Sequence, residues 1–314
     1  MKKIFILLVL ILSISYWQCT KQSSEMTMIK LGYAPIADAA QIYVGIEKGY
    51  FAENRLKIQF EQLGSGAKIL EAVGAGSVQI GLSSYVPLIL ARAAGVDLVA
   101  ISGGAVEDST HWEHAYVVKS DSKITSIKDI EDKTLALNGL RNIDHLLFQE
   151  LMEKYNIDQT KIRLVEIPFP RMESVLQSGE VDIIAAIEPF VTRAISRGNY
   201  RVLTYNYLEL YKKVPVACYV AKNKWIEENN DVLTRFINAF NKATEFCLAH
   251  PDSLREIIGK YTKLSSDELQ KISLPTFSFE TDKVDLQGLI DRMQKRNMLS
   301  RKVSAEEMIH LYNK

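Results

Sequence analysis

The sequence AVGAGSVQIG at residues 72–81 and the sequence VLQSGEVDII at residues 175–184 share one pattern of residue types. Each starts with apolar residues at helical spacing, passes through a glycine and continues into a short strand-like run. A helix led by a proline follows each of them, at Pro87 and at Pro189. A unit repeated in this way indicates two similar α/β lobes instead of one large sheet. Chance convergence on a common αβα unit is the alternative explanation.

Strand-like and helix-like segments alternate from Ile29 onward, as in an α/β protein whose sheets are mostly parallel. The first half is predicted to run β-α-β-α-β-α-β, and the second half repeats the theme as far as Ile187. Residues 230–313 are predicted to be mainly helical. The fold class predicted from this order is α/β, with two doubly wound lobes.

Two segments, 114–119 and 214–221, are predicted to be strands that cross between the lobes. The chain would leave the first lobe through one of them and return through the other. Two crossings form a hinge, and a hinge between two lobes creates a cleft. The predicted limits are 28–112 plus 216–314 for the first lobe and 113–215 for the second.

The composition argues against several classes of protein. The chain of 314 residues has 38 Lys and Arg against 38 Asp and Glu, so it lacks the cationic excess by which proteins bind nucleic acid. Its 47% of hydrophobic residues is enough for folded cores, and its length suits two domains. Three dispersed cysteines make neither a disulfide framework nor a zinc knuckle. Cys218 and Cys247 are therefore interpreted as buried thiols, with a disulfide between them as the alternative.

The first 18 residues are predicted to be a signal peptide. Lys2 and Lys3 precede an apolar run over 4–12, which is too short to span a bilayer as a stable helix. Cys19 and a polar tether over 19–27 follow, and this arrangement resembles a bacterial lipoprotein signal in which the cysteine is acylated. The bulky residues just before Cys19 depart from that pattern. Cleavage after Ser15 to give a soluble exported protein, or an uncleaved anchor, are the alternatives; all three place the protein outside the cytoplasmic membrane.

Six motifs in family order carry a resemblance that extends over nearly the whole mature chain. They are YVGIEKGYF (43–51), GSVQIG (76–81), SIKDIEDKT (126–134), IPFPRM (167–172), SGEVD (178–182) and EPF (188–190). With them the sequence resembles the SsuA/NMT1/THI5-like substrate-binding proteins of ABC importers, which have the type II periplasmic-binding, or Venus-flytrap, fold. Glu131-Asp132 stands where that family prefers a glycine.

The resemblance implies a function and a set of partners. Such proteins capture a small solute in the cleft and present it to an ABC permease and its ATPase, without catalysis, cofactor or metal. For this chain it implies a monomer in the periplasm or at the cell surface, anchored to the membrane by a lipid on Cys19.

Polar loops that follow predicted strands supply the candidate ligand-binding residues, because ligands of doubly wound folds bind beyond the carboxyl ends of the strands. The residues Asn138 and Asn142 are placed at the cleft by the family resemblance. The candidates are Asp38, Gly64, Ser65, Gly66, Ser83, Ser84, Trp112, Asn138, Arg141, Asn142 and Glu188.

Each candidate also has a purely structural interpretation. The glycines and serines are ordinary in turns and helix caps, and the two asparagines are ordinary in turns. Trp112 is either a stacking or lid residue or part of interlobe packing. Asp38 and Glu188 either contact a ligand or make internal hydrogen bonds. A metal site at His111 and His114 is disfavoured, because residues three apart on a strand point to opposite faces.

The nature of the ligand stays open between two classes. Asp38 and Glu188 favour an amine or an aminopyrimidine, whereas Arg141, Arg171 and the serine loops favour a sulfonate, nitrate or carboxylate. A nitrogen heterocycle is slightly preferred because several aromatic side chains are available for stacking. Those side chains are Tyr33, Tyr85, Trp112, Phe169 and Phe190.

Two other functions stay as alternatives. One is an extracellular module that reports ligand occupancy to a membrane partner. The other is a THI5-like enzyme of pyrimidine synthesis, but such enzymes depend on a cysteine-rich iron site that three dispersed cysteines do not supply.

Overall fold

The computed structural model of the protein describes residues 25–310. The predicted signal peptide, Cys19 and most of the predicted tether lie outside the described residues. Among those that are described, no helix combines the length and apolar character needed to cross a bilayer.

Strands from both ends of the chain build the first sheet, whose order is β2-β1-β3-β12-β4. Strand β1 pairs parallel with β2 and with β3, whereas β12 runs antiparallel between β3 and β4. The strands are β1 (Thr27–Tyr33), β2 (Leu56–Gln62), β3 (Ile80–Ser84), β4 (Leu98–Gly103) and β12 (Ala217–Lys222).

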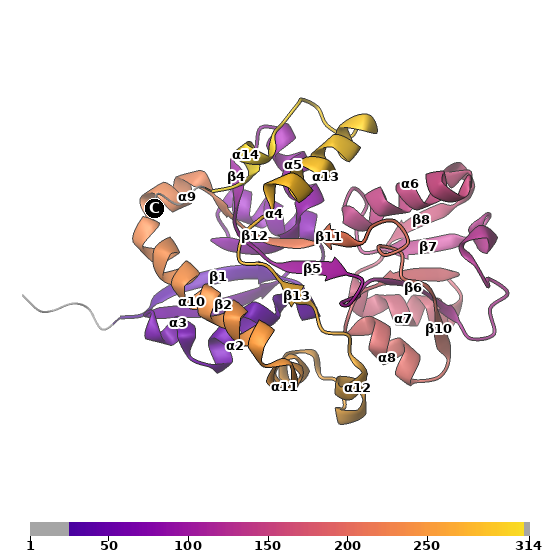
Figure 1. Ribbon diagram of the computed structural model, residues 1–314, viewed down its shortest axis with the longest axis horizontal. Helices are drawn as coiled ribbons and strands as arrows, with labels where there is room; N and C mark the ends of the chain where they lie inside the picture. The colour runs from indigo at the N-terminus through magenta and orange to yellow at the C-terminus, as the bar shows by residue number, and fades with distance from the viewer. Residues whose placement is uncertain (1–24, 311–314) are drawn as a thin grey trace, which may run out of the picture.

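The middle of the chain builds a second sheet, whose order is β10-β6-β9-β7-β8. Strand β7 pairs parallel with β8 and β9, and β6 runs antiparallel to β9 and β10. The strands are β6 (Ala115–Lys119), β7 (Thr134–Leu137), β8 (Arg163–Glu166), β9 (Ile183–Ala186) and β10 (Tyr200–Thr204). The two sheets confirm the predicted α/β class, and each lies in its own half of the molecule (Figure 1).

The sequence repeat has equivalent places in the two sheets. Helix α4 (Gly66–Ala75) ends at Gly76, and α7 (Phe169–Ser178) ends at Gly179, with left-handed φ values of 78° and 80°. Glycine is favoured there because a side chain disfavours positive φ. The strands that follow, β3 and β9, each pair with one parallel and one antiparallel neighbour. The repeat therefore corresponds to one supersecondary unit used in both halves.

A third, small sheet lies between the other two. It contains β11 (Lys213–Pro215), β5 (Ala105–Asp108) and β13 (Thr276–Phe277), all antiparallel. The chain passes from β5 into the second sheet and returns through β11, which lies beside β5 in Figure 1. The prediction that 114–119 crosses between the lobes is wrong, because those residues include β6, which pairs with β9 and β10 inside the second sheet. The exact lobe limits stay a prediction.

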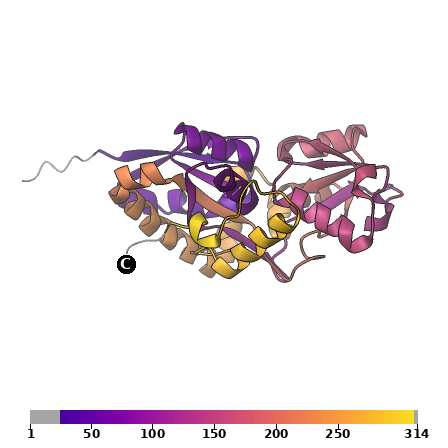
Figure 2. The same cartoon turned by 90° about the horizontal axis from the view of Figure 1, so that it is seen from above.

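Helices cover both sheets, and the helices after β12 pack mainly on the first-sheet half (Figures 1 and 2). The α-helices not yet given are α2 (Ala40–Glu47), α3 (Tyr50–Glu53), α5 (Tyr85–Ala93), α6 (Ile143–Tyr155), α8 (Phe190–Ser196), α9 (Asn223–Glu228), α10 (Asn230–Ala249), α11 (Pro251–Thr262), α12 (Ser266–Lys271), α13 (Lys283–Lys295) and α14 (Ala305–Met308). Three short 3-10 helices are η1 (Ala37–Ala39), η2 (Ile127–Ile130) and η3 (Gln159–Lys161).

The largest apolar core fills the first-sheet half, and Phe51, Phe236 and Phe240 stack within it at 5.4 and 5.7 Å between ring centroids. Leu146 and Leu147 of α6 join this core, although α6 follows a strand of the second sheet. Helix α6 therefore bridges the two halves, next to the place where the strand ends of both sheets meet.

Candidate functional site

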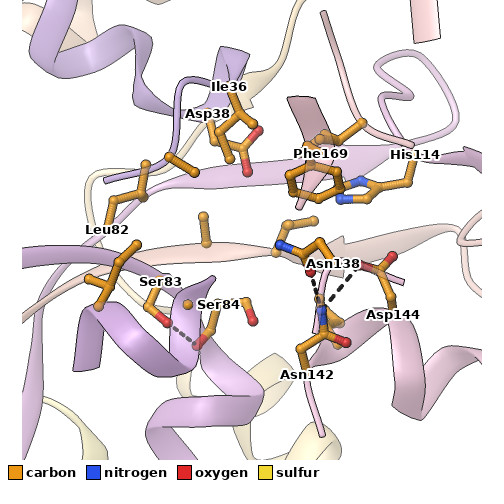
Figure 3. Close-up of a pocket in the computed structure, with 17 residues that line it drawn as sticks. Ile36, Asp38, Leu82, Ser83, Ser84, His114, Asn138, Asn142, Asp144 and Phe169 are labelled. Atoms are coloured by element: carbon orange, nitrogen blue, oxygen red, sulfur yellow. Dashed lines mark hydrogen bonds between the residues drawn. The ribbon is translucent and has the colours of Figure 1, made fainter. Parts of the chain in front are cut away.

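A cavity of about 60 Å³ lies between the two halves, at the carboxyl ends of β1, β3 and β7. Residues from both halves line it, with apolar side chains such as Ile36, Leu82 and Phe169 among them (Figure 3). Its polar lining consists of Asp38, Ser83, Ser84, His114, Asn138, Asn142 and Asp144. The position agrees with the rule that open α/β sheets bind ligands beyond their strand ends.

Gly66 and the two serines form the wall of the cavity on the first-sheet side. Ser83 and Ser84 are the last residues of β3, and Gly66 begins α4. A Cβ on Gly66 would lie 2.7 Å from the Ser83 Oγ atom, so any larger residue at this helix start would require that hydroxyl to move.

Two asparagines form part of the opposite wall. Asn142 is the N-cap of α6: its side-chain oxygen accepts from the His145 N–H at 2.9 Å, and its Nδ2 donates to Asn138 Oδ1 at 2.5 Å. Nδ2 also donates to Asp144 Oδ2 at 3.3 Å. Because Asn142 holds the Asn138 oxygen, the Asn138 amide nitrogen is left as the donor for a ligand.

The Asp38 carboxylate is 2% exposed and lines the cavity from η1, just after β1. Glu113, which is 1% exposed, adjoins it. Asp38 Oδ1 and both Glu113 oxygens meet no N–H or hydroxyl donor, so the hydrogen bond between the two carboxyl groups requires a proton on one of them. Burial raises the pKa of both carboxyl groups, and the neighbouring Asp38 charge raises that of Glu113 further, well above its ordinary value, so Glu113 holds the shared proton.

His114 lies at the edge of the cavity and pairs with the buried carboxylate of Glu107, at 2.7 Å between Nδ1 and Oε2. The ring of Tyr207 stacks on the imidazole at 4.0 Å between centroids. Burial disfavours the imidazolium, but the hydrogen bond and charge of Glu107 outweigh it and raise the pKa of His114. Glu107 therefore favours the imidazolium form of His114 and is positioned to act as its counter-ion.

Asp144, in the first turn of α6, is the second carboxyl group of the lining. The Tyr207 hydroxyl donates to its Oδ1 at 2.9 Å. Burial raises its pKa above the ordinary value, against the effect of the His114 charge.

Of the predicted site residues, the structure brings together Asp38, Gly66, Ser83, Ser84, Asn138 and Asn142 around the cavity. Glu188 does not line it. Its carboxylate accepts from the Thr192 N–H at 3.1 Å and the Thr192 hydroxyl at 2.8 Å, and weakly from the Ser273 N–H at 3.4 Å. Burial raises the pKa of Glu188 to about 7. The geometry gives it the role of an internal hydrogen-bond acceptor beneath α8.

Four other predicted residues also lie away from this lining. Ser65 accepts from Lys68 N as the N-cap of α4, and Gly64 lines a neighbouring groove beside Phe169. Arg141 is exposed and adopts a left-handed φ of 61°. Trp112 is 37% exposed, with its ring 5.8 Å from that of Tyr205.

Sequence patterns alone indicate neither His114 nor Asp144 as a ligand contact. His114 was considered only as a metal ligand with His111, but the two histidines have separate carboxylate partners, Glu107 and Asp108. In residues 25–310 no group of three or more His, Cys, Asp or Glu side chains has an arrangement suited to a metal ion. Of the aromatic candidates, Phe169 lines the cavity, and Phe190 stacks on it at 6.0 Å.

Comparison with known proteins gives a family model and several relatives. The model described as NMT1/THI5 like matches residues 36–254. A relative from Escherichia coli K12, named for binding aliphatic sulfonates, is 27% identical over 199 residues, which are 62% of this chain and 59% of its own length. A 4-amino-5-hydroxymethyl-2-methylpyrimidine phosphate synthase of Candida albicans is 25% identical over 232 residues, 70% of this chain and 66% of its own. The matches thus span less than two thirds of both relatives.

Two further similarities cover nearly the whole chain. The formylaminopyrimidine-binding protein of Halalkalibacterium halodurans is 21% identical over 297 residues, 90% of this chain and 86% of its own. The solved structure of the alkanesulfonate-binding protein SsuA from Xanthomonas axonopodis pv. citri, bound to MOPS, superposes with a TM-score of 0.77 at 17% identity, covering 91% of this chain and 99% of its own. The architecture is therefore that of the periplasmic binding proteins.

Proposed function

The chain belongs to the NMT1/THI5-like family, and we propose that it is an extracytoplasmic solute-binding protein that delivers a small ligand to an ABC importer. The observation that carries this proposal is the cavity between the two halves, lined by polar residues from both of them. Within residues 25–310, the chain passes between the two sheets twice, next to the paired strands β5 and β11. Such a connection allows the halves to close on a ligand by hinge motion.

The polar lining supports a nitrogen heterocycle as the ligand. Asp38 and Asp144 are acceptors, the Asn138 amide is a donor, and Phe169 offers a ring for stacking. The names of two relatives, one a formylaminopyrimidine-binding protein and one a pyrimidine phosphate synthase, agree with this class. The cavity holds roughly five water-sized groups, so a single-ring solute requires the halves to open slightly.

A sulfonate or nitrate is the second candidate class. The Ser83 and Ser84 hydroxyls and the start of α4 suit an anion, and one relative is named for binding aliphatic sulfonates. Against it, Arg141 and Arg171, which would balance the charge, are both exposed. An enzymatic role is disfavoured because Cys218 and Cys247 are separate buried thiols in β12 and α10, so they do not contribute to a cysteine-rich iron site.

A thermal-shift screen tests the proposal. Purified protein is melted with pyrimidines, flavins, amines, sulfonates and nitrate, and at 100 times Kd a ligand stabilises the folded state by about 2.7 kcal/mol. For a chain of this size that is a rise in Tm of about 5 °C. Asn138→Ala removes a donor from the cavity and is expected to abolish the shift, whereas Asn199→Ala, at an exposed site, retains it. A panel without any stabiliser contradicts solute capture.

Anchoring and delivery are separate parts of the proposal. The signal sequence and Cys19 support a lipid-anchored monomer that meets a permease and its ATPase at the membrane surface. Cys19→Ala is expected to leave an unacylated precursor, and membrane-bound mature protein from that variant would refute lipidation. A sensor-kinase gene beside this one, with no permease or ATPase gene, would instead favour the sensory alternative.

A further inference from the structure

The charges around the cavity are unbalanced. Asp38, Glu113 and Asp144 lie in or beside its lining, and the described chain brings no lysine or arginine into that lining. The one basic side chain there, His114, is already paired with Glu107 at 2.7 Å. A buried carboxylate without a cationic partner or enough donors is costly, so something else must supply the balance.

Asp38 is the lining carboxylate with fewer donors than Asp144: its side-chain partner is Glu113, and the nearby His114 charge belongs to an imidazole already paired with Glu107. It is 2% exposed, it lines the cavity, and its Oδ1 atom meets no N–H or hydroxyl donor. Asp144, by contrast, receives the Tyr207 hydroxyl at 2.9 Å and the Asn142 amide at 3.3 Å. Figure 3 shows Asp38 on the opposite side of the cavity from Ser83, Ser84 and Asn142, so a solute between them meets its carboxylate directly.

Glu113 positions this carboxylate. The proton between the two carboxyl groups belongs to Glu113, whose pKa is raised well above its ordinary value by burial and by the neighbouring acidic groups. Burial raises the pKa of Asp38, while the His114 charge and the bond from protonated Glu113 lower it, so the two carboxyl groups share one proton and one negative charge. When Glu107 and His114 are both charged, this pair adds no net charge to the cavity.

From this charge inventory we propose that the cavity binds its solute as a cation, through a planar amidine-like N–C–N group that pairs with the Asp38 carboxylate. Two parallel N–H groups match the two oxygens of a carboxylate, as in arginine–carboxylate pairs. Phe169 offers a ring at the same cavity, which suits a flat cation. The inference rests on the proposed solute capture and narrows it to protonated amidines, guanidines and aminoheterocycles; Asp38 is the specificity-determining residue.

Isosteric probes of different charge test this inference. Acetamidine, acetamide and acetate have the same shape and carry charges of +1, 0 and −1 at neutral pH, and benzamidine, benzamide and benzoate form the matching ring series. Each is titrated at constant ionic strength, with Tm and calorimetric Kd as readouts. The two amidines are expected to raise Tm and to bind at least about 30-fold more tightly than their amides, with no shift from the carboxylates.

Variants separate the charge of Asp38 from its shape. Asp38→Asn is expected to raise the Kd of the amidines by about 30-fold or more while leaving amide binding nearly unchanged. Glu113→Gln, which keeps a donor beside Asp38, is expected to preserve amidine binding. Asp252→Asn changes the same charge at a side chain that is 99% exposed and serves as the matched control.

The outcomes distinguish the inference from the proposed function. Tighter binding of acetate, benzoate or ethanesulfonate than of the amidines leaves solute capture intact and overturns the cationic ligand. Equal loss of amide and amidine binding in Asp38→Asn shows a structural role and also overturns it. If none of these probes, and none of the wider thermal-shift panel, stabilises a protein that melts cooperatively, the proposed function itself fails.

Discussion

The Glu150 carboxylate of α6 lies 3.4 Å from the guanidinium of Arg296, the residue after α13. This ion pair joins α6, which begins at the cavity, to a helix of the first-sheet half. Arg292 approaches the same oxygen at 3.5 Å, and the Tyr211 hydroxyl donates to the other at 2.6 Å. Glu150 is only 5% exposed. The buried Glu150 carboxylate thus contacts two guanidinium groups and one phenol where the two halves meet.

Replacing this acid by its amide tests how much the contact stabilises the fold. Glu150→Gln keeps the shape but leaves Arg292 and Arg296 without their buried counter-charge, which costs about 2 kcal/mol of unfolding free energy, less than a fully buried pair because both arginines are partly exposed. Urea unfolding measures the change. Glu131→Gln, in an exposed pair with Lys161, is the control and is expected to change stability by under about 0.5 kcal/mol. Equal effects of the two variants would contradict the assignment.

The approach of Ser65 to Gly139 yields a second prediction, about closure. A Cβ on Gly139 would lie 3.6 Å from the Ser65 Cβ across the mouth of the cavity. Gly139→Ala therefore fits, whereas Gly139→Phe is expected to hold the halves apart and to weaken ligand binding at least tenfold by lowering the population of the closed state. Calorimetry with the best stabiliser of the panel measures affinity, and small-angle scattering measures the radius of gyration. Unchanged affinity in Gly139→Phe would show that closure does not depend on this contact.

The fold could be predicted because its determinants are local. The Gly76 and Gly179 turns between helix and strand, with the proline-led helices after them, are readable from short windows. The crossing predicted at 114–119 is wrong, and the one at 214–221 joins β11 to β12 of the first sheet, because β5 and β11 have only four and three residues. Strands this short carry too little periodicity to be separated from their neighbours, and only their pairing in space identifies them.

About half of the candidate site could be predicted, for a related reason. Asp38 lies in the loop after β1, Ser83 is near the end of β3 and Asn138 follows β7 directly, so the general rule for α/β folds finds them. His114 and Asp144 stand where a structural role is the ordinary expectation, and their relevance depends on tertiary contacts with Glu107 and Tyr207. Glu188 was predicted from its place after a buried strand, but its hydrogen bonds with Thr192 were not visible in the sequence.

The buried cysteines yield a third prediction, on thiol accessibility. Cys218 is fully buried and Cys247 is 3% exposed; burial raises the pKa of Cys247 to about 12 and that of Cys218 further. A thiol reagent such as DTNB is therefore expected to leave both unlabelled in the folded protein.

Labelling in guanidinium then also tests the anchor. If Cys19 is acylated, the denatured mature protein is expected to show two DTNB-reactive thiols. The denatured Cys19→Ala precursor also shows two, whereas an unmodified full-length chain shows three. Mass spectrometry of the N-terminal peptide separates the first two cases. Rapid labelling of Cys218 or Cys247 in the folded protein would contradict the burial of that side chain.

Glu188 yields the fourth prediction, on the pH dependence of stability. Burial raises its pKa from 4.5 to about 7 in the folded protein, against the lowering effect of its bonds with Thr192 and Ser273. The unfolded chain therefore loses this proton first as pH rises. The contribution of Glu188 to the free energy of unfolding is fully present below pH 4.5 and is lost as pH increases through about 7. Since one pKa unit corresponds to about 1.36 kcal/mol, the change is about 3 kcal/mol.

Glu188→Gln isolates this contribution, because it removes the titration and keeps an acceptor for the Thr192 hydroxyl. Free energies of unfolding are measured in urea at pH 4.5, 6 and 8 for both proteins, so that the other buried groups, Asp38, Glu113, His114 and Asp144, cancel in the difference. The wild type is expected to lose about 3 kcal/mol relative to the variant between pH 4.5 and 8. A difference that stays constant over this range would mean that the carboxyl group keeps its ordinary pKa when folded, and that its hydrogen bonds outweigh burial.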